Sequence, residues 1–258
     1  MIIKGFEKLS LSDYPGNVSC VIFTPGCNLA CPFCHNSDLV LNSHKLKLIP
    51  EKNVFEYLNK RKGLIDGMVI TGGEPTLQKD LGDFLRKIKA LDYKIKLDSN
   101  GTNPEVLKAI LSLIDLLAID VKTELTDEEY KKFGLKTDVS PILKSLELAA
   151  KSGLPIELRT TIVPKLHDEK IIQKMSAQLA EIFKDRLSSP RHPDPSTIRH
   201  SEALGPKNLD PKVRWYLQTF RPGTCLDEKY NDEKPYSKAE MQKLLDVAKP
   251  IFPSVFLR

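Results

Sequence analysis

The sequence lacks long hydrophobic runs, a strong excess of charge of one sign, and internal repeats. Its most apolar stretch, residues 111–121, is broken by Ser112, Asp115 and Asp120, and it falls far short of the roughly 20 residues that a membrane helix needs. Lys and Arg number 39 against 34 Asp and Glu, a difference too small and too scattered to indicate nucleic-acid binding. The absence of a repeated unit excludes a solenoid.

What the chain does contain is the composition of a globular protein. It has 258 residues, of which 41% are hydrophobic and 28% are charged, and this balance argues against a disordered chain or a fibre. The length favours one large domain over two. Charges at Lys4 and Glu7 come too early for the apolar core of a secretory signal peptide. We therefore expect a cytoplasmic protein with reduced thiols and no membrane association.

Short apolar runs alternate with longer amphipathic stretches, which predicts an α/β fold with a mostly parallel sheet. The predicted strands cover residues 18–23, 67–70, 94–98, 116–120, 155–162 and 213–219. Apolar residues three and four apart predict a helix over residues 77–91, and capping signals begin further helices near Asn103, Thr126, Ser140 and Asp168. About five βα units predict an incomplete, open (β/α) barrel like a partial TIM barrel, with its chemistry at the carboxyl ends of the strands.

One segment, residues 188–211, interrupts this alternation. It contains five prolines, the histidines His192 and His200, and little periodicity, so we predict a long loop or an insertion. Residues 1–187 are expected to form the core of the barrel, and residues 212–258 to complete the same domain.

Three of the five cysteines, Cys27, Cys31 and Cys34, lie within eight residues directly after the first predicted strand. Three thiolates on one short loop can ligate three irons of a [4Fe–4S] cube and leave the fourth iron open to an exogenous ligand. Structural zinc with His35 as the fourth ligand is the alternative, but the adjacent Cys34 and His35 fit one tetrahedral ion poorly. The spacing favours the cluster, with His35 packing beside it.

The other two cysteines have no clustered partners. Cys20 lies inside a predicted strand, where we expect it to pack as a small hydrophobic residue. Cys225 follows Arg-Pro-Gly-Thr and is expected to be a free thiol. The sequence therefore gives no support for a second iron–sulfur site.

A second motif, Gly-Gly-Glu-Pro at residues 72–75, follows the predicted strand 67–70. Its glycines allow the backbone to approach a ligand closely, and Glu74 places a carboxylate near the end of the strand. On its own, such a motif indicates no more than a turn. Because it follows the cysteine loop by one βα unit, the two motifs together form a specific functional signal.

Together, the C-x3-C-x2-C motif, Phe33 before its last cysteine, and Gly-Gly-Glu-Pro resemble the radical S-adenosylmethionine (SAM) superfamily. The resemblance implies one [4Fe–4S] cluster on the three cysteines and SAM bound to the open iron. Gly72, Gly73 and Glu74 are then cofactor-binding residues, with Gly73 and Glu74 at the amino group of SAM. It also implies reductive cleavage of SAM to a 5′-deoxyadenosyl radical, which abstracts a hydrogen atom.

Four further segments resemble the glycyl-radical-enzyme activating enzymes: residues 8–16, 34–36, 97–101 and 117–122. The likeness is greatest to the anaerobic ribonucleoside-triphosphate reductase activating proteins, with the pyruvate formate-lyase activating enzyme as a cousin. It covers about residues 1–165, with a weaker echo at 215–223. It implies a glycyl radical enzyme as partner and an electron donor such as flavodoxin or ferredoxin.

The resemblance also assigns roles at the ends of later strands. Asp98, Ser99 and Asp120 would contact SAM and, as in the formate-lyase branch, a monovalent cation beside its carboxylate. For Asp98 and Asp120 the alternative is that they cap the loops that follow them. Lys122 would bind the SAM carboxylate or pair with Glu124 in solvent.

Two further residues are candidates for a role in the site. Arg159, on the fifth predicted strand, would direct its guanidinium at an anionic site or form a buried pair with a carboxylate. Asp13 would help to place the substrate or would only form a turn before Tyr-Pro-Gly.

Two other functions remain open from the sequence. One is a radical enzyme that acts on a small molecule, a peptide or an RNA nucleoside. The other is a non-enzymatic module stabilised by zinc, which would leave the Gly-Gly-Glu-Pro motif and the later aspartates unexplained.

Overall fold

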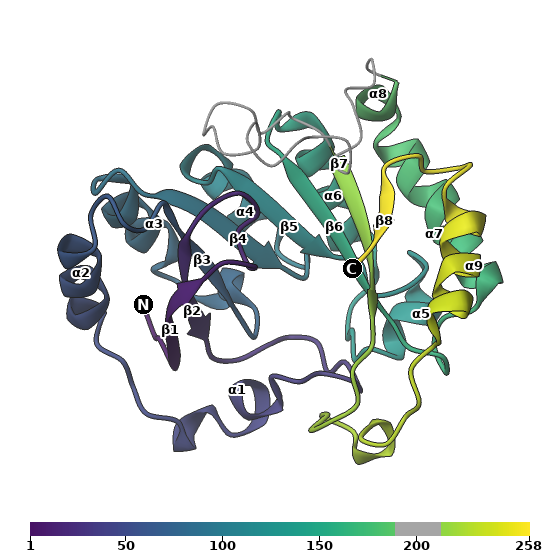
Figure 1. Cartoon of the computed structure of the whole chain (residues 1–258), viewed down its shortest axis with the longest axis horizontal. Helices are drawn as coiled ribbons and strands as arrows, with labels where there is room; N and C mark the ends of the chain where they lie inside the picture. The colour runs from purple at the N-terminus through teal and green to yellow at the C-terminus, as the bar shows by residue number, and fades with distance from the viewer. Residues whose placement is uncertain (189–212) are drawn as a thin grey trace.

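The computed structural model describes residues 1–188 and 213–258, and in it one eight-stranded sheet runs in the order β1 to β8 (Figure 1). Its strands are β1 Gly5–Ser10, β2 Ser19–Thr24, β3 Gly67–Gly72, β4 Lys94–Ser99, β5 Leu116–Asp120, β6 Ile156–Ile162, β7 Val213–Thr219 and β8 Val255–Leu257. β1 pairs antiparallel with β2, and every later neighbour pair is parallel. β1 and β8 are the two edges, so the predicted open α/β partial barrel is confirmed.

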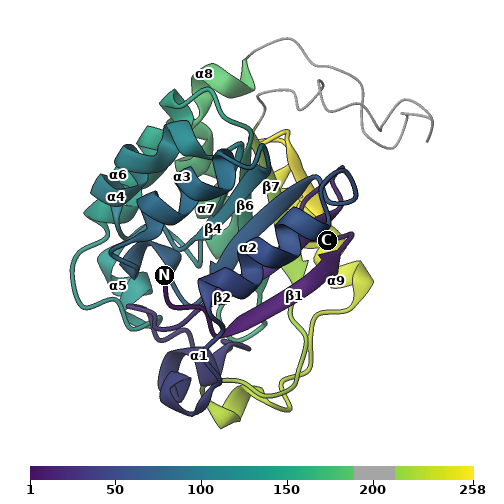
Figure 2. The same ribbon diagram turned by 90° about the vertical axis from the view of Figure 1, so that its left-hand side faces the viewer.

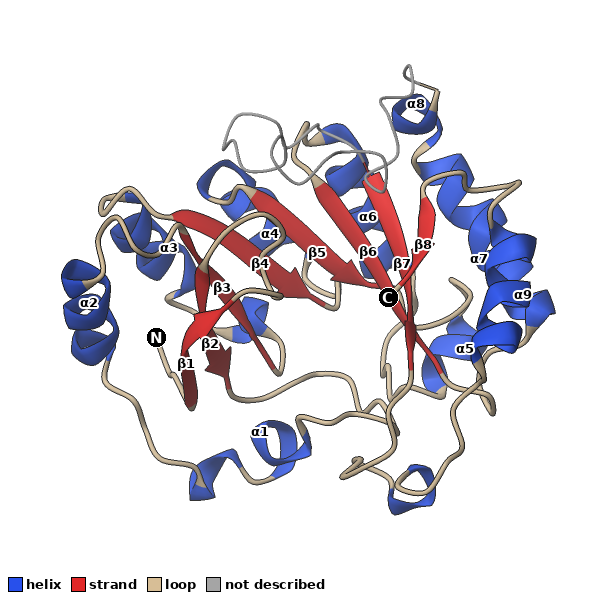
Figure 3. Cartoon of the chain, in the orientation of Figure 1, coloured by secondary structure: helices blue, strands red, loops and turns tan. Residues whose placement is uncertain are grey.

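The described α-helices are α1 Ser37–Leu41, α2 Glu51–Lys60, α3 Leu81–Lys89, α4 Pro104–Ile110, α5 Asp127–Lys131, α6 Ser140–Lys151, α7 Glu169–Ile182, α8 Lys184–Leu187 and α9 Lys238–Ala248. Helices α3, α4, α6 and α7 lie together against one face of the sheet (Figures 2 and 3). Among the described helices, none is long and apolar enough to cross a membrane.

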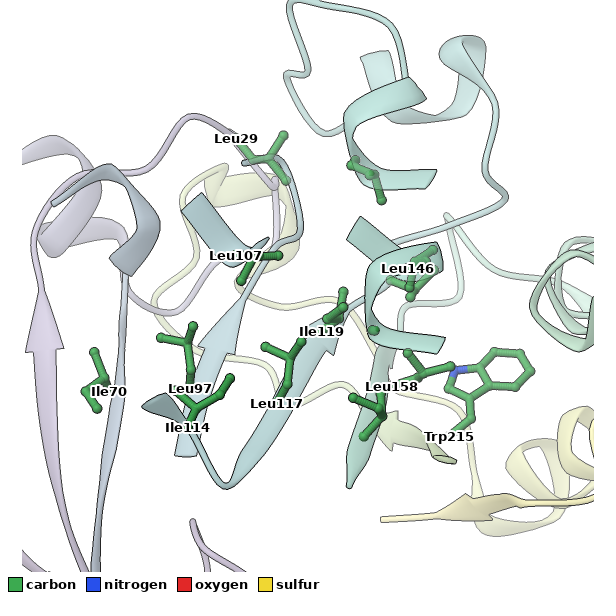
Figure 4. Packing of buried hydrophobic residues seen from close by; sticks show 14 of the residues in the cluster. Leu29, Ile70, Leu97, Leu107, Ile114, Leu117, Ile119, Leu146, Leu158 and Trp215 are labelled. Atoms are coloured by element: carbon green, nitrogen blue, oxygen red, sulfur yellow. The ribbon is translucent and has the colours of Figure 1, made fainter. Parts of the chain in front are cut away.

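The side chains of each strand alternate between the two faces of the sheet, and the apolar side chains on one face form the main core. Ile70, Leu97, Ile119 and Leu158 are fully buried in the main hydrophobic cluster, which also contains residues of the covering helices (Figure 4). The buried Trp215 belongs to the same cluster, and its indole Nε1 donates to Thr160 Oγ1 at 2.9 Å. The apolar positions of period two thus fix which face the helices cover.

The opposite face of the strands is the inner surface of the open barrel. At its amino-terminal end Tyr14 is fully buried among Val21, Val69, Leu116 and Ala118, which form a second, smaller cluster. Further along the same strands the inward side chains are charged, as described below. This apolar cluster fills the amino-terminal end of the barrel, so the polar residues that can carry out chemistry lie at the carboxyl-terminal end.

Several elements differ from the sequence prediction. The strands β1 and β8 and the helices α2 and α9 were not predicted. The helix predicted over residues 77–91 begins only at Leu81, because residues 75–77 form a separate 3-10 turn that the Glu74 side chain caps through Thr76 N–H. The segment predicted as a long loop, residues 188–211, lies outside the described residues except for Ser188.

Candidate active site

The cysteine loop lies between β2 and α1, at the carboxyl ends of the parallel strands (Figure 1). Two backbone hydrogen bonds hold its shape: Gly26 N–H donates to Leu39 O at 2.9 Å, and Ala30 N–H donates to Phe133 O at 2.8 Å. Gly26 adopts a φ of 79°, a backbone conformation that glycine reaches without strain. The loop is therefore anchored on both sides before any cofactor binds.

The three thiols of this loop differ in exposure. Cys31 is buried, whereas Cys27 and Cys34 are half-buried, and none forms a disulfide. Burial raises the pKa of all three thiols, and that of Cys31 to about 12, while the charge of Lys122 opposes this rise. The free thiols are thus protonated at neutral pH, and a metal must displace these protons when it binds.

The sulfur atoms of this loop, and the hydrogen bonds that one of them accepts, suit an iron–sulfur cluster. Cys27 Sγ accepts from Leu29 N–H at 3.4 Å and from the Asn100 amide at 3.7 Å, contacts of the kind that tune such clusters. Within the described ranges, no three Cys, His, Asp or Glu side chains converge closely enough for a single metal ion. The preference for a cluster over zinc therefore rests on the spacing of the three cysteines and on the poor fit of the adjacent Cys34 and His35 to one tetrahedral ion.

The glycines of the Gly-Gly-Glu-Pro motif join the end of β3 to the cysteine loop. Gly73 N–H donates to Thr24 O at 2.9 Å, and Glu74 N–H donates to Gly26 O at 2.7 Å. A Cβ on Gly73 would lie 1.8 Å from the Gly26 carbonyl oxygen, and Gly72 has a φ of 121°. No larger residue fits this contact. The close approach is therefore to the loop itself, and the predicted contact with SAM stays a prediction.

Glu74 is fully buried and ties β3 to β4. Its Oε1 accepts from the backbone and side chain of Thr76 and from Ser99 Oγ at 2.9 Å, and its Oε2 accepts from Asn100 N–H at 2.6 Å. Burial raises the pKa of Glu74, and the four donors act in the opposite direction. The hydrogen bond to this carboxylate fixes the position of Ser99, which the sequence predicted to contact SAM.

The inner face carries a network of ion pairs at the ends of β4, β5 and β6. Arg159 Nη1 donates to Asp98 Oδ2 at 3.0 Å, and Arg159 Nε donates to Asp120 Oδ1 at 2.8 Å. Lys122 Nζ lies 3.0 Å from Asp120 Oδ2. Lys96 Nζ lies 3.0 Å from Asp98 Oδ1, as an ion pair rather than an aligned hydrogen bond. The predicted strand-end positions of Asp98 and Asp120 are confirmed.

These pairs keep their members charged. Burial opposes ionisation, but the charge of Arg159 holds the pKa values of Asp98 and Asp120 below their usual range. Burial likewise opposes the charge on Lys122 and Arg159, and Asp120 nevertheless raises both of their pKa values. For Arg159, the predicted alternative of a buried carboxylate pair is the arrangement that the structure shows.

Two other predicted contacts are resolved. Lys122 pairs with Asp120 and not with Glu124, which binds Lys174 at 2.8 Å, so that alternative was wrong. Lys122 follows the end of β5 by two residues and reaches the Asp120 carboxylate, whereas the Glu124 carboxylate is bound by Lys174. Asp13 accepts from Ser10 Oγ in a local turn.

The segment after β7 covers the cysteine loop. His35 Nε2 lies 2.8 Å from Arg221 O, and its ring stacks on Phe220 with centroids 5.9 Å apart. Asp227 N–H donates to Pro32 O at 2.9 Å. His35 therefore packs beside the loop, as predicted. Cys225 is buried in the same covering segment.

Sequence reasoning missed Lys96, Asn100 and His167. Lys96 is 1% exposed. It alternates with the apolar Ile95 and Leu97 and so shares a strand face with Asp98, which was a signal that the two side chains pair. Asn100 lies inside the segment 97–101 but was assigned no role. His167 is buried and lies 2.7 Å from Lys122 O, a contact that sequence spacing does not indicate.

A groove of about 860 Å³ lies elsewhere, between β1 and α2, and is lined by Phe6, Tyr57 and Leu64 among others. None of the predicted site residues lines it. We therefore assign the chemistry to the carboxyl ends of the strands, where the thiols and the ion-pair network lie.

An open parallel α/β barrel with a thiol-rich loop at the carboxyl ends of its strands defines the class of this protein. Residues 21–176 match the Radical SAM superfamily, and the chain belongs to that superfamily. The family implies a [4Fe–4S] cluster and SAM as cofactors.

Individual relatives refine this placement. A Methanocaldococcus jannaschii protein assigned as a glycyl-radical enzyme activating enzyme is 32% identical, over 100% of this chain and 95% of that protein. A GTP 3′,8-cyclase from Helicobacter pylori is 28% identical over 71% of this chain, which spans only 57% of the cyclase. A solved domain of a pyruvate-formate lyase-activating enzyme from Bacteroides vulgatus shares the fold, with a TM-score of 0.51 and 19% identity over 74% of this chain and 98% of that domain.

Proposed function

We propose that this chain is an activating enzyme that installs a glycyl radical on a partner protein. The observation that carries the proposal is the three-thiol loop joined directly to Gly-Gly-Glu-Pro at the mouth of the barrel. The similarity of the whole chain to a protein assigned as an activating enzyme supports the same function. In this proposal Cys27, Cys31 and Cys34 hold the cluster, and SAM occupies the fourth iron.

When bound at Cys27, Cys31 and Cys34, a reduced cluster would supply one electron for the cleavage of a carbon–sulfur bond of SAM to methionine and a 5′-deoxyadenosyl radical, which would take a hydrogen atom from glycine. The residues of this chain supply position and charge. Asn100 donates to Cys27 Sγ, and Glu74 fixes Asn100 and Ser99 beside the thiols. Gly73 and Glu74 are proposed at the amino group of SAM, and Lys122 at its carboxylate.

Among the described residues, β1 and β8 do not pair with each other, so the sheet is not closed into a full barrel. An open surface can admit a protein loop that carries the target glycine, whereas a small substrate is usually enclosed in a pocket. Flavodoxin or ferredoxin is the proposed class of electron donor. Asp13 is proposed to help to place the substrate, with its carboxylate bound to Ser10 Oγ in the turn.

The test of the partner is spectroscopic. The reconstituted, reduced chain is incubated anaerobically with SAM and a candidate glycyl radical enzyme from the same genome. We expect a glycyl doublet in the electron paramagnetic resonance spectrum and one 5′-deoxyadenosine per radical. SAM cleavage without a doublet on any such partner would contradict the activating function while leaving the radical chemistry intact.

The second candidate is a radical enzyme that acts on a small molecule. The similarity to a GTP 3′,8-cyclase favours it specifically. Incubation with GTP and other nucleotides, followed by mass spectrometry, separates the two functions: a new product whose formation depends on SAM would support this candidate.

A further inference from the structure

Asp98 and Asp120 end neighbouring strands, and all four of their carboxylate oxygens face cationic side chains. Arg159 takes one oxygen of each, at 3.0 and 2.8 Å. Lys96 faces the second oxygen of Asp98 and Lys122 the second oxygen of Asp120, each at 3.0 Å. Hard cations bind through free oxygen ligands, and this pair of carboxylates presents no oxygen without a cationic neighbour.

The carboxylates of the site are already compensated. Lys96 also lies 3.5 Å from Glu157 Oε2, and Arg258 Nη1 lies 3.9 Å from the same oxygen. The three carboxylates therefore face four cations, namely Lys96, Lys122, Arg159 and Arg258. The side chains of Asp98, Arg159 and Asp120 are only 11%, 14% and 28% exposed. Because charges in such surroundings are weakly screened, a further bound cation would add an uncompensated positive charge.

The guanidinium is also held in place by the sheet. Arg159 is in register with Asp120 across β5 and β6, and its planar fork reaches two carboxylates at once. Because arginine is always charged and is part of the chain, its positive charge is present at this position whichever cation the medium contains.

We propose that Arg159 serves as the internal cation of this site, in the position beside Asp98 and Asp120 that the family resemblance assigned to a monovalent cation. Arg159 is a positioning residue: it fixes two carboxylates at the mouth of the barrel. The chain then folds and binds SAM without a requirement for K⁺ or Na⁺.

The experiment uses thermal unfolding of the cluster-free chain without SAM, so its outcome is independent of the proposed function. Wild type, Arg159→Gln, Arg159→Lys and Lys174→Gln are unfolded in KCl, NaCl or tetramethylammonium chloride at equal ionic strength. Lys174→Gln is the matched control, because it breaks an exposed ion pair with Glu124. The Tm of the wild type, of the control Lys174→Gln and of Arg159→Lys, which keeps a positive charge at this position, is expected to be the same in all three salts.

Arg159→Gln leaves two buried carboxylates without their shared partner, and we expect its Tm in tetramethylammonium to fall by about 10 °C. K⁺ or Na⁺ should restore part of this loss in a saturable manner, because the ion enters the vacated position. A Tm of Arg159→Gln that does not respond to K⁺ or Na⁺ would contradict the proposal.

A second measurement does not depend on that variant folding. Thallium(I), a spectroscopic substitute for K⁺, is titrated into the wild-type chain and followed by thallium nuclear magnetic resonance. No saturable binding is expected. Saturable binding that Asp120→Asn removes would overturn the proposal.

Discussion

His167 links the end of β6 to the loop after β5 through both nitrogens of its ring. Val163 N–H donates to Nδ1 at 3.0 Å, so Nε2 carries the proton and donates to Lys122 O at 2.7 Å. Burial lowers the pKa of His167 below that of an exposed histidine, against the effect of its two backbone hydrogen bonds. The neutral ring therefore belongs to the folded chain and helps to place Lys122.

This residue predicts a pH dependence of stability. A lowered pKa in the folded chain means that the unfolded chain binds the proton more readily, so stability is full above about pH 6.5 and falls below it. The slope is about 1.4 kcal/mol per pH unit for one proton. Urea unfolding at pH 7.5, 6.5 and 5.5 should show that His167→Gln loses this part of the slope. An unchanged slope in the variant would mean that another group carries the dependence.

At the scale of elements, the decisive contact joins β3 to the cysteine loop. Gly73 lies against the Gly26 carbonyl so closely that a methyl group cannot be placed there. The sequence indicated why glycine was needed, namely close approach, but not what approaches. A pair of sequence motifs cannot reveal which backbone they contact, since this depends on the packing of two segments far apart in the chain.

We predict that Gly73→Ala displaces the loop and weakens cluster binding by at least about tenfold, a loss near 1.4 kcal/mol or more, so that the chain retains less iron after reconstitution. Iron and sulfide assays on the purified chain measure it. The matched control is Gly82→Ala in α3, where the nearest atoms to a new Cβ lie 3.7 Å away, and helix propensity favours alanine. Equal iron content in the two variants would contradict the role of this contact.

Other elements show what the sequence could and could not predict. The buried parallel strands β5 and β7 match their predicted bounds, because continuous or alternating apolar residues identify them. β1 was missed because an edge strand such as Gly5–Ser10 buries little of its surface and depends on β2 for its pairing. α9 carries a capping box between Ser237 and Glu240, a signal that could have identified it.

The site follows the same rule. Individual residues at strand ends, such as Asp98 and Asp120, could be predicted because parallel strands bring their carboxyl ends to one edge. Their shared partner Arg159 could be offered only as one of two alternatives. Which carboxylate meets which cation depends on strand register, and register is a tertiary property.

At the scale of the whole molecule, the sheet is continuous from β1 to β8 across the described residues. We predict that the chain unfolds as one cooperative unit, because both halves share this sheet and its core. The single tryptophan, Trp215, lies in β7 and reports on the carboxyl-terminal half. Its fluorescence and the far-ultraviolet circular dichroism should change at the same urea concentration. Two separate transitions would indicate two domains.

In the proposed function, the three-cysteine loop supports reductive cleavage of SAM. The most direct measurement is the yield of 5′-deoxyadenosine and methionine from the anaerobically reconstituted, reduced chain, quantified by mass spectrometry. We predict equimolar products from wild type and from the control Cys225→Ala. Loss of the cluster and of more than about 99% of cleavage is expected in Cys27→Ala, Cys31→Ala and Cys34→Ala, because each removes a ligand to iron. A fully loaded wild-type cluster that releases no 5′-deoxyadenosine would contradict the account.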